Sequence, residues 1–146
     1  MNQPKPLQPG LRHTERMVVT PAHTVPQVGG WPGFADMPPV FATAMMIGFM
    51  EQTCIQALRP YLAPGQHTVG TQVDMNHVAA TPVGMAVQAE VELVAVEGQS
   101  LTFKVTCSDD AGLIGEGTHR RAIIDPRRFE ERLAAKAAAH SGASGI

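Results

Sequence analysis

The hydrophobic pattern changes its period along the chain, and the change separates two kinds of predicted element. Residues 40–60 have no proline before the last position and are apolar almost all the way round, which is typical of a helix buried inside a fold. From His67 onward, apolar and polar residues alternate, which predicts strands. The sequence therefore predicts an α+β fold, in which an antiparallel sheet wraps around one long central helix.

Turn residues divide the alternating region into strands. We predict strands at residues 67–77, 85–93, 101–107 and 113–124, with turn-forming residues between them. A short first strand is predicted within residues 11–21. At the other end, Pro126 is expected to open a short amphipathic helix that carries Phe129 and Leu133.

Residues 21–39 contain many prolines and glycines, which break regular structure and predict a long loop. Loops of this length usually have a function or are disordered. Trp31, Phe34 and Met37 give this loop apolar groups that would prefer a surface to cover. Two interpretations stay open here, namely a lid over a binding site and a segment that only closes the core.

The two ends of the chain are rich in Pro, Gly, Ala and Ser and lack an apolar stripe. We expect a disordered tail at residues 1–10 and a flexible tail at residues 137–146. A single domain is expected between them, at residues 11–136, which agrees with a total length of 146 residues.

Composition narrows the choice of partners. The net charge is -2 and the basic and acidic residues are mixed, so the chain offers no broad positive surface for a nucleic acid. No apolar run approaches the roughly 20 residues of a membrane span, and the N-terminus lacks the pattern of a secretory signal, so a cytoplasmic protein is expected. Cys54, Cys107 and the scattered histidines lack the spacing of a disulfide framework or a metal site.

The low charged fraction, 16%, and the open edge of a single sheet favour a partner subunit. We therefore expect a homodimer, and a tetramer stays open.

Glu51 is the unusual residue of the predicted helix. Helical spacing surrounds it with apolar residues such as Ile47 and Ile55, and the helix offers it no basic partner. Burying an unpaired carboxylate is costly, which is typical of a residue that must give or take protons. The alternative is that Glu51 lies on a polar fringe with Gln52 and Gln56.

Thr43 and His77 are further candidates. Thr43 is expected to be the N-cap of the helix, and this helix end could also receive a developing oxyanion. Thr43 lies eight residues and about 80° from Glu51, so periodicity does not bring the two together. His77 is predicted on the same strand face as Val73 and Met75, either as a core histidine or as a catalytic one.

Two segments, FATAMMIGFMEQTC at 41–54 and VGTQVDMNHVAATPVG at 69–84, resemble the fluoroacetyl-CoA thioesterases and related hotdog-fold acyl-CoA thioesterases. The resemblance continues in matching register from residue 34 to residue 121. It implies a hotdog fold that pairs as a double-hotdog dimer. It also implies hydrolysis of a short acyl-CoA to the free acid and coenzyme A, with no cofactor, because coenzyme A is part of the substrate.

The same resemblance assigns roles to individual residues. It implies that Thr43, Glu51 and His77 form the catalytic set. It places Gly70 beside the site, where a missing side chain would let a thioester approach the backbone. It places Arg121 close to bound coenzyme A, where a guanidinium could pair with a phosphate.

One position departs from the family pattern. Phe34 matches one lid aromatic, whereas Met37 stands where the family has a second lid phenylalanine. Methionine is flexible, so we expect a looser pocket mouth and an acyl group that can differ from fluoroacetyl. Whether Glu51 acts as nucleophile or general base stays open, and so do two other functions, a non-catalytic acyl-CoA binding module and a hotdog enoyl-CoA hydratase.

Overall fold

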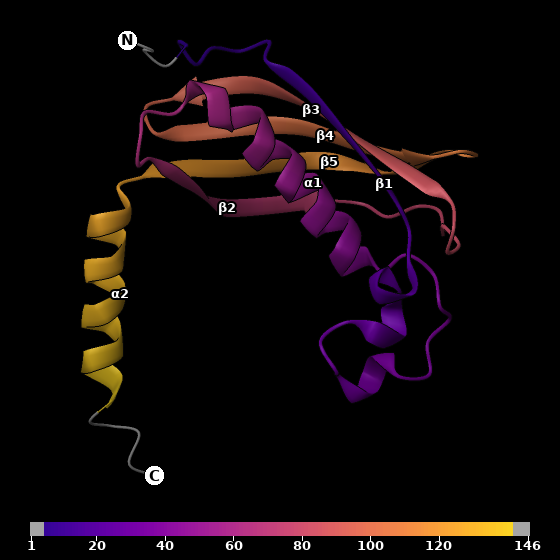
Figure 1. Cartoon of the computed structure of the whole chain (residues 1–146). Coiled ribbons are helices and arrows are strands. Elements are labelled where there is room, and N and C mark those ends of the chain that lie inside the picture. The colour runs from indigo at the N-terminus through magenta and orange to yellow at the C-terminus, as the bar shows by residue number, and fades with distance from the viewer. Residues whose placement is uncertain (1–4, 142–146) are drawn as a thin grey trace.

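A computed structural model of the chain describes residues 5–141. Five antiparallel strands form one sheet in the order β1-β3-β4-β5-β2, and the long helix α1 crosses one face of this sheet (Figure 1). In chain order, the elements are β1 (Arg12–Val18), α1 (Thr43–Leu58), β2 (His67–Met75), β3 (Ala86–Glu97), β4 (Ser100–Asp109), β5 (Gly112–Ile124) and α2 (Pro126–Ser141).

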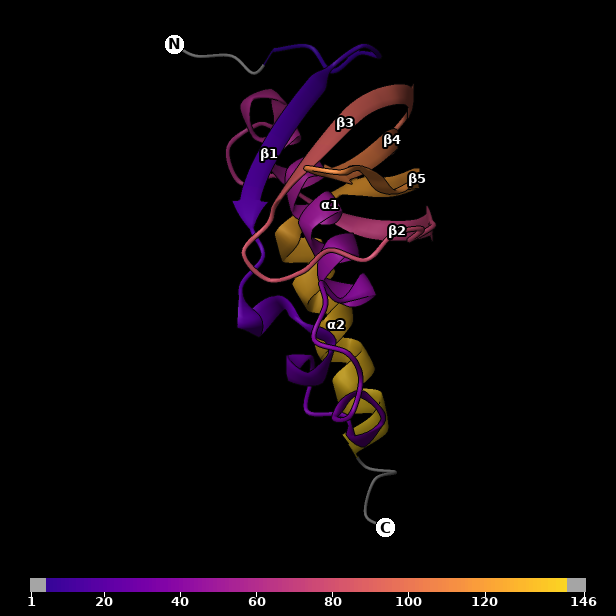
Figure 2. The same ribbon diagram turned by 90° about the vertical axis from the view of Figure 1, so that its right-hand side faces the viewer.

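The core lies between α1 and the concave side of the sheet (Figure 2). Alternate residues of β3 and β4 are buried there, and their neighbours face outward, as the period of two predicted. Phe103 of β4 and Met50 of α1 are both fully buried in this layer. The predicted arrangement of a sheet around one central helix is confirmed.

The loop at residues 21–39 contains three short 3-10 helices, Pro21–His23, Val25–Gln27 and Pro32–Phe34. It extends beyond the N-terminal end of α1 (Figure 1). Trp31 packs edge-on against Phe34, with ring centroids 5.5 Å apart, but its side chain remains 61% exposed, and Met37 is 47% exposed. Both apolar groups therefore remain largely open to solvent within the described chain.

Both chain ends are more ordered than expected wherever they are described. Helix α2 continues to Ser141, so residues 137–141 are helical, because their alanines are strong helix formers. Near the N-terminus, Leu7 packs against the core and the Gly10 N–H donates to the Leu93 carbonyl. Residues 1–4 and 142–146 of the two expected tails lie outside the described residues.

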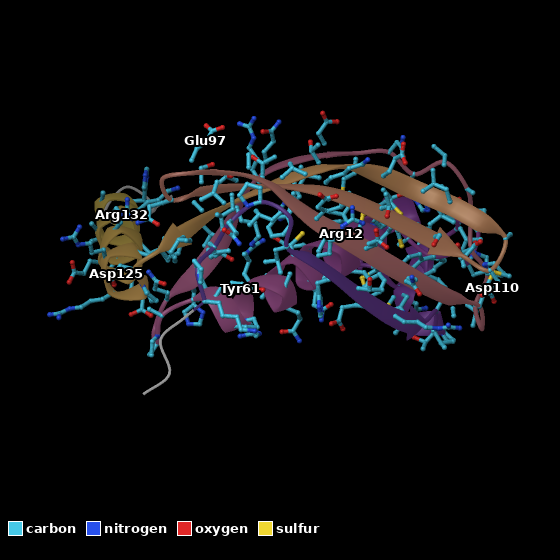
Figure 3. The ribbon with its side chains drawn as sticks, turned by 90° about the horizontal axis from the view of Figure 1, so that it is seen from above. Arg12, Tyr61, Glu97, Asp110, Asp125 and Arg132 are labelled. Atoms are coloured by element: carbon cyan, nitrogen blue, oxygen red, sulfur yellow. The ribbon has the colours of Figure 1, made fainter. Side chains whose placement is uncertain are left out.

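The loop 21–39 and α2 leave opposite ends of the sheet and project to the same side of it, beyond α1 (Figures 1 and 2). Seen from above, Arg132 of α2 lies at one end of the molecule and Asp110 of the β4–β5 turn at the other (Figure 3). Strand β2 forms one edge of the sheet and is mostly exposed on both faces. This edge borders the site described next.

Candidate active site

Thr43 and His77 are in direct contact. Thr43 is the first residue of α1, and His77 lies in the loop two residues after β2. Thr43 Oγ1 and His77 Nδ1 are 2.7 Å apart, a hydrogen-bond distance. The expectation that Thr43 is the N-cap is wrong, because Ala42 is the N-cap and the Thr43 hydroxyl is engaged by the imidazole.

The second ring nitrogen of His77 is left without a partner. Its Nε2 atom is buried and forms no hydrogen bond with the described residues. Burial lowers the pKa of His77, and the backbone of Ala79 partly offsets this shift. A neutral imidazole with one free nitrogen can exchange a proton with a bound molecule.

The loop that carries His77 is fixed to β5 by its neighbours. The Asn76 N–H donates to the Glu116 carbonyl, and the Val78 N–H donates to the Ile114 carbonyl. The Asn76 side chain accepts from the Glu116 N–H in return. His77 was predicted to be the last residue of the strand β2, but it lies in this loop, which hydrogen bonds hold against β5. From this position its side chain reaches Thr43 at the start of α1.

Glu51 is neither fully buried nor unpaired, so the interpretation of it as a desolvated carboxylate without a partner is wrong. Its side chain is 41% exposed, and its Oε2 atom accepts a hydrogen bond of 2.8 Å from Arg121 Nη1. Helical spacing cannot indicate this partner, because Arg121 lies 70 residues away on β5. The carboxylate is therefore both held by a cation and open to solvent.

Arg121 is 3% exposed, and every side-chain nitrogen of its guanidinium is occupied. Its Nε donates to the Thr68 hydroxyl and its Nη2 to the Thr68 carbonyl, at 2.8 and 2.9 Å. Its Nη1 lies against Glu51 and also 3.1 Å from His119 Nε2. The guanidinium is thus turned inward toward Glu51, and the expected contact with a coenzyme A phosphate stays a prediction.

Gly70 provides the space for this ion pair. A Cβ atom on Gly70 would lie 2.8 Å from Glu51 Oε2, 3.3 Å from His119 Cε1 and 3.4 Å from Arg121 Nη1. The first of these distances is shorter than any ordinary contact of a Cβ atom. Gly70 therefore lies beside Glu51, and its missing side chain makes room for the carboxylate.

His119 is a member of this cluster that the sequence analysis missed. Its side chain is fully buried and lies between Arg121 and the Gln72 carbonyl, which is 2.8 Å from His119 Nδ1. The sequence did contain a signal for it. His119 and Arg121 are two residues apart on one predicted strand, so they share a face, and polar residues on the core-facing side of a strand are unusual.

The candidates form two clusters within one chain. Thr43 and Glu51 are eight helical residues apart, which is about 12 Å along α1. Gly70, which touches the Glu51 carboxylate, and Met75, which ends β2 before His77, are about 16 Å apart along the strand. The Thr43–His77 pair and the Glu51–Arg121 pair therefore lie near opposite ends of β2.

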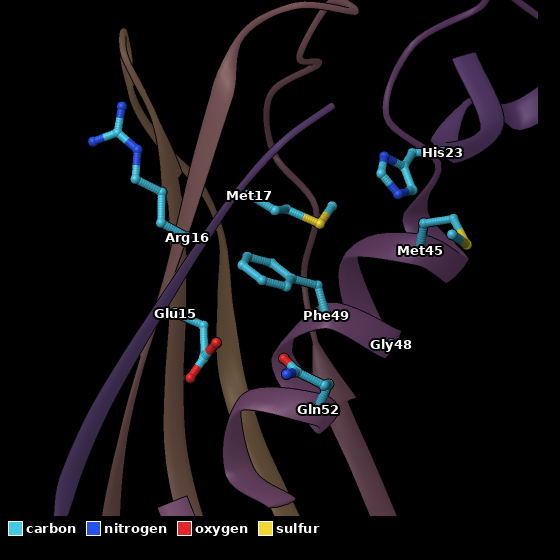
Figure 4. Close-up of a pocket in the computed structure, with 8 residues that line it drawn as sticks. All are labelled: Glu15, Arg16, Met17, His23, Met45, Gly48, Phe49 and Gln52. Carbon is cyan, nitrogen blue, oxygen red and sulfur yellow. The ribbon is translucent and has the colours of Figure 1, made fainter. Parts of the chain in front are cut away.

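A cavity of about 340 Å³ lies on the other side of α1, between this helix and β1. Figure 4 shows Met17 and Phe49 pointing into it from the two elements, with His23 at its end near Met45. None of its lining residues belongs to the predicted catalytic set.

Within residues 5–141, no helix is both long enough and apolar enough to cross a membrane. In the same part of the chain, no group of three or more His, Cys, Asp or Glu side chains is placed to hold a metal ion.

The sequence model of one protein family, described as the fluoroacetyl-CoA-specific thioesterase family, matches residues 19–127. The chain belongs to this family. It is 42% identical over 128 residues to the fluoroacetyl-CoA thioesterase of Streptantibioticus cattleyicolor, an alignment that covers 87% of this chain and 92% of that relative.

Solved structures agree with this assignment. A solved structure of the fluoroacetyl-CoA thioesterase matches with a TM-score of 0.87 and 41% identity, over 90% of the present chain and 98% of the matched chain. A Thermus thermophilus thioesterase superfamily member matches with a TM-score of 0.80 and 28% identity, over 92% and 98% of the two chains. A hot-dog-like protein from Thermanaerovibrio acidaminovorans, at 20% identity and a TM-score of 0.76 over 88% and 91% of the two chains, supports the fold alone. The expected hotdog fold and thioesterase family are confirmed.

Proposed function

We propose that this protein is a cytoplasmic homodimer that hydrolyses a small acyl-CoA, similar to fluoroacetyl-CoA, to the free acid and coenzyme A. Membership of the thioesterase family supports the reaction. A variant of the related fluoroacetyl-CoA thioesterase has been solved with fluoroacetate and CoA, and another variant with acetyl-CoA. These ligands support a small acyl group for the present chain.

The free Nε2 atom of His77 is the observation that most directly supports a catalytic site. If the Thr43 hydroxyl donates to Nδ1, then Nε2 carries the ring proton and can deliver it to a leaving group. In thioester hydrolysis the leaving group is the sulfur of coenzyme A. We assign His77 to this proton transfer and Thr43 to holding the imidazole in the required tautomer.

We assign to Glu51 the attack on the carbonyl carbon of the thioester, which it can perform by one of two routes. As nucleophile, its carboxylate attacks this carbon, the C–S bond breaks, and water then hydrolyses the resulting anhydride. As general base, it takes a proton from a water molecule that attacks the same carbon. Both routes consume one water and release one acid and one thiol.

Single-turnover hydrolysis in ¹⁸O-labelled water, combined with trapping of the intermediate, distinguishes the two routes. Label on Glu51 together with an unlabelled first acid identifies the nucleophile route, because water has then opened the anhydride at the Glu51 carbonyl. When the label enters the acid alone, trapping decides: an acyl group captured on Glu51 identifies the nucleophile route, and its absence identifies the general-base route.

The separation of the two clusters supports a site shared between two chains. Groups that act on one carbonyl carbon must lie within a few ångströms of it, roughly 3–3.5 Å for an attacking atom. Within one chain, Thr43 and Glu51 are about 12 Å apart along the helix, which is too far for a single carbonyl. A second copy of the chain can supply the missing half.

The exposed edge of β2 offers a way to build this dimer. Edge strands present unpaired backbone groups, and antiparallel pairing of β2 with its copy would satisfy them. A two-fold axis near Val73 would place Gly70 of one copy opposite Asn76 of the other. Glu51 of one copy would then lie near the other copy's Thr43 and His77, which come from the opposite end of β2.

The test is release of free thiol from acetyl, fluoroacetyl, branched, aromatic and longer acyl-CoAs by wild-type protein and by Glu51→Gln. Glu97→Gln is the matched control, because it neutralises an exposed carboxylate that points away from the sheet (Figure 3). We expect turnover to be lost in Glu51→Gln only. Full turnover in Glu51→Gln would overturn the assignment.

The same panel, with an enoyl-CoA added to it, separates the other functions. Binding of acyl-CoA by the wild-type protein without thiol release would indicate a binding module. Loss of enoyl absorbance without thiol release would indicate a hydratase. The ranking of acyl groups also tests Met37, since a looser mouth predicts that larger groups than fluoroacetyl are accepted.

A further inference from the structure

Two basic side chains are buried directly behind Glu51. His119 is fully buried and Arg121 is 3% exposed, and both lie on the core-facing side of β5. Burying two cations side by side would be strongly unfavourable. One of the two groups must therefore be neutral, and arginine keeps its charge in proteins, so this group is His119.

The hydrogen bonds of His119 define its tautomer. Its Nδ1 atom lies 2.8 Å from the Gln72 carbonyl, which can only accept, so Nδ1 carries the proton. Its Nε2 atom lies 3.1 Å from Arg121 Nη1, which can only donate, so Nε2 is the acceptor. Burial lowers the pKa of His119 and the nearby Arg121 charge adds to this shift, whereas the Gln72 carbonyl and the Glu51 carboxylate oppose it.

Arg121 Nη1 is the shared donor of the cluster. It lies 2.8 Å from Glu51 Oε2 on one side and 3.1 Å from His119 Nε2 on the other. Glu51 Oε2 and His119 Nε2 are themselves 3.9 Å apart, but a neutral imidazole forms no ion pair, so both atoms act as acceptors around one donor. The remaining guanidinium nitrogens bind Thr68, and the plane of the group is thereby fixed.

We infer that His119 is a positioning residue for the proposed reaction: as a neutral acceptor it fixes the guanidinium of Arg121, which in turn holds the Glu51 carboxylate in its working orientation. His119 does not touch the substrate in this account. The inference rests on the proposed role of Glu51.

Two substitutions at His119 separate its two hydrogen bonds. In His119→Gln, the side-chain amide reaches the position of Nε2 and retains an acceptor for Arg121. In His119→Asn, the amide reaches only the position of Nδ1, so it retains the bond to the Gln72 carbonyl and loses the acceptor for Arg121. Both variants replace a buried ring by a smaller amide, so each is a control for the other.

The measurement is kcat and KM for the preferred acyl-CoA, together with the thermal midpoint of each variant. We expect His119→Asn to lower kcat by roughly tenfold or more, because small misplacements of a reacting group have large effects on rate. KM should change little, since His119 does not bind substrate, and His119→Gln should retain most of the wild-type kcat.

Two results would overturn the inference while Glu51→Gln remains inactive. One is wild-type kcat in His119→Asn. The other is an equal fall of kcat and thermal midpoint in both variants, which is the signature of a purely structural residue. If His119→Asn does not fold, Arg121→Lys is measured instead, because lysine lacks the planar guanidinium that His119 is inferred to fix. A fall in kcat at unchanged KM supports the inference, and unchanged kcat overturns it. Full activity in Glu51→Gln would instead indicate that the proposed function itself is wrong.

Discussion

Substitution of Gly70 by alanine tests whether the space around the Glu51 carboxylate matters for activity. The new methyl group would lie 2.8 Å from Glu51 Oε2, where an ordinary contact needs at least about half an ångström more. Its other neighbours, His119 and Arg121, are buried, whereas Glu51 is 41% exposed at the end of a flexible side chain. We therefore expect the carboxylate to move and the buried groups to stay.

The size of the effect follows from this geometry. Moving Glu51 Oε2 away from Gly70 weakens its hydrogen bond to Arg121, and a charge-assisted bond of this kind contributes about 1.5–3 kcal/mol when it is desolvated. Because Glu51 is partly exposed, solvent screens the pair, and we expect a loss of about 1 kcal/mol or less in stability. Activity should fall more, by about 10-fold to 100-fold in kcat, because the displaced group is the one assigned to the reacting carbon.

Thiol release and thermal unfolding should be measured on Gly70→Ala and on Gly48→Ala. Gly48 lies within α1, and apart from the adjoining backbone of the helix itself, a Cβ atom there would meet no atom within 4 Å. Gly48→Ala should retain activity and raise stability by about 0.5–1 kcal/mol, since alanine favours a helix interior. Wild-type kcat in Gly70→Ala would refute the reasoning, and so would a stability loss as large as that of a core deletion, about 3 kcal/mol or more.

Two other predictions concern titration and thiol chemistry. Burial lowers the pKa of both His77 and His119, so the folded state binds fewer protons than the unfolded chain as pH falls below the ordinary histidine value of 6.5. The free energy of unfolding should therefore be constant above about pH 6.5 and fall below it. Urea unfolding measured at a series of acidic pH values should show a smaller fall for His119→Gln than for the wild-type protein. Identical pH dependence in both proteins would contradict this. Burial raises the pKa of the Cys54 and Cys107 thiols to about 12, so a thiol reagent should label neither in the native protein and both after denaturation. Fast native labelling would contradict the buried positions.

The fold could be predicted from the sequence because the central strands of the sheet are buried on one face and exposed on the other. Residues that alternate along β3 and β4 face either the core or solvent, so the period of two defines these strands. The alanine-rich end of α2 was misread, because small residues without an apolar stripe are typical of both a loose tail and an exposed helix.

The candidate site could be predicted only in part. The sequence offered Thr43, Glu51 and His77 as candidates, but it did not offer the contacts that they make with other elements. Thr43 was expected to cap its own helix, whereas its hydroxyl meets an imidazole 34 residues away. The predicted helix offered Glu51 no cation, and it is β5 that brings Arg121 to it from 70 residues away. Such pairings depend on strand order and register, and helical periodicity contains no information about either.

A mixing experiment tests the shared site most directly. Glu51→Gln and His77→Asn, each inactive alone, are unfolded together, refolded as an equal mixture, and assayed for thiol release. If Glu51 of one chain serves Thr43 and His77 of the other, each mixed dimer has one complete site, and the mixture should recover about a quarter of wild-type activity per chain. If the two clusters of one chain act together, every site lacks one residue. A mixture that stays as inactive as its two parents, although mixed dimers form, would contradict the account.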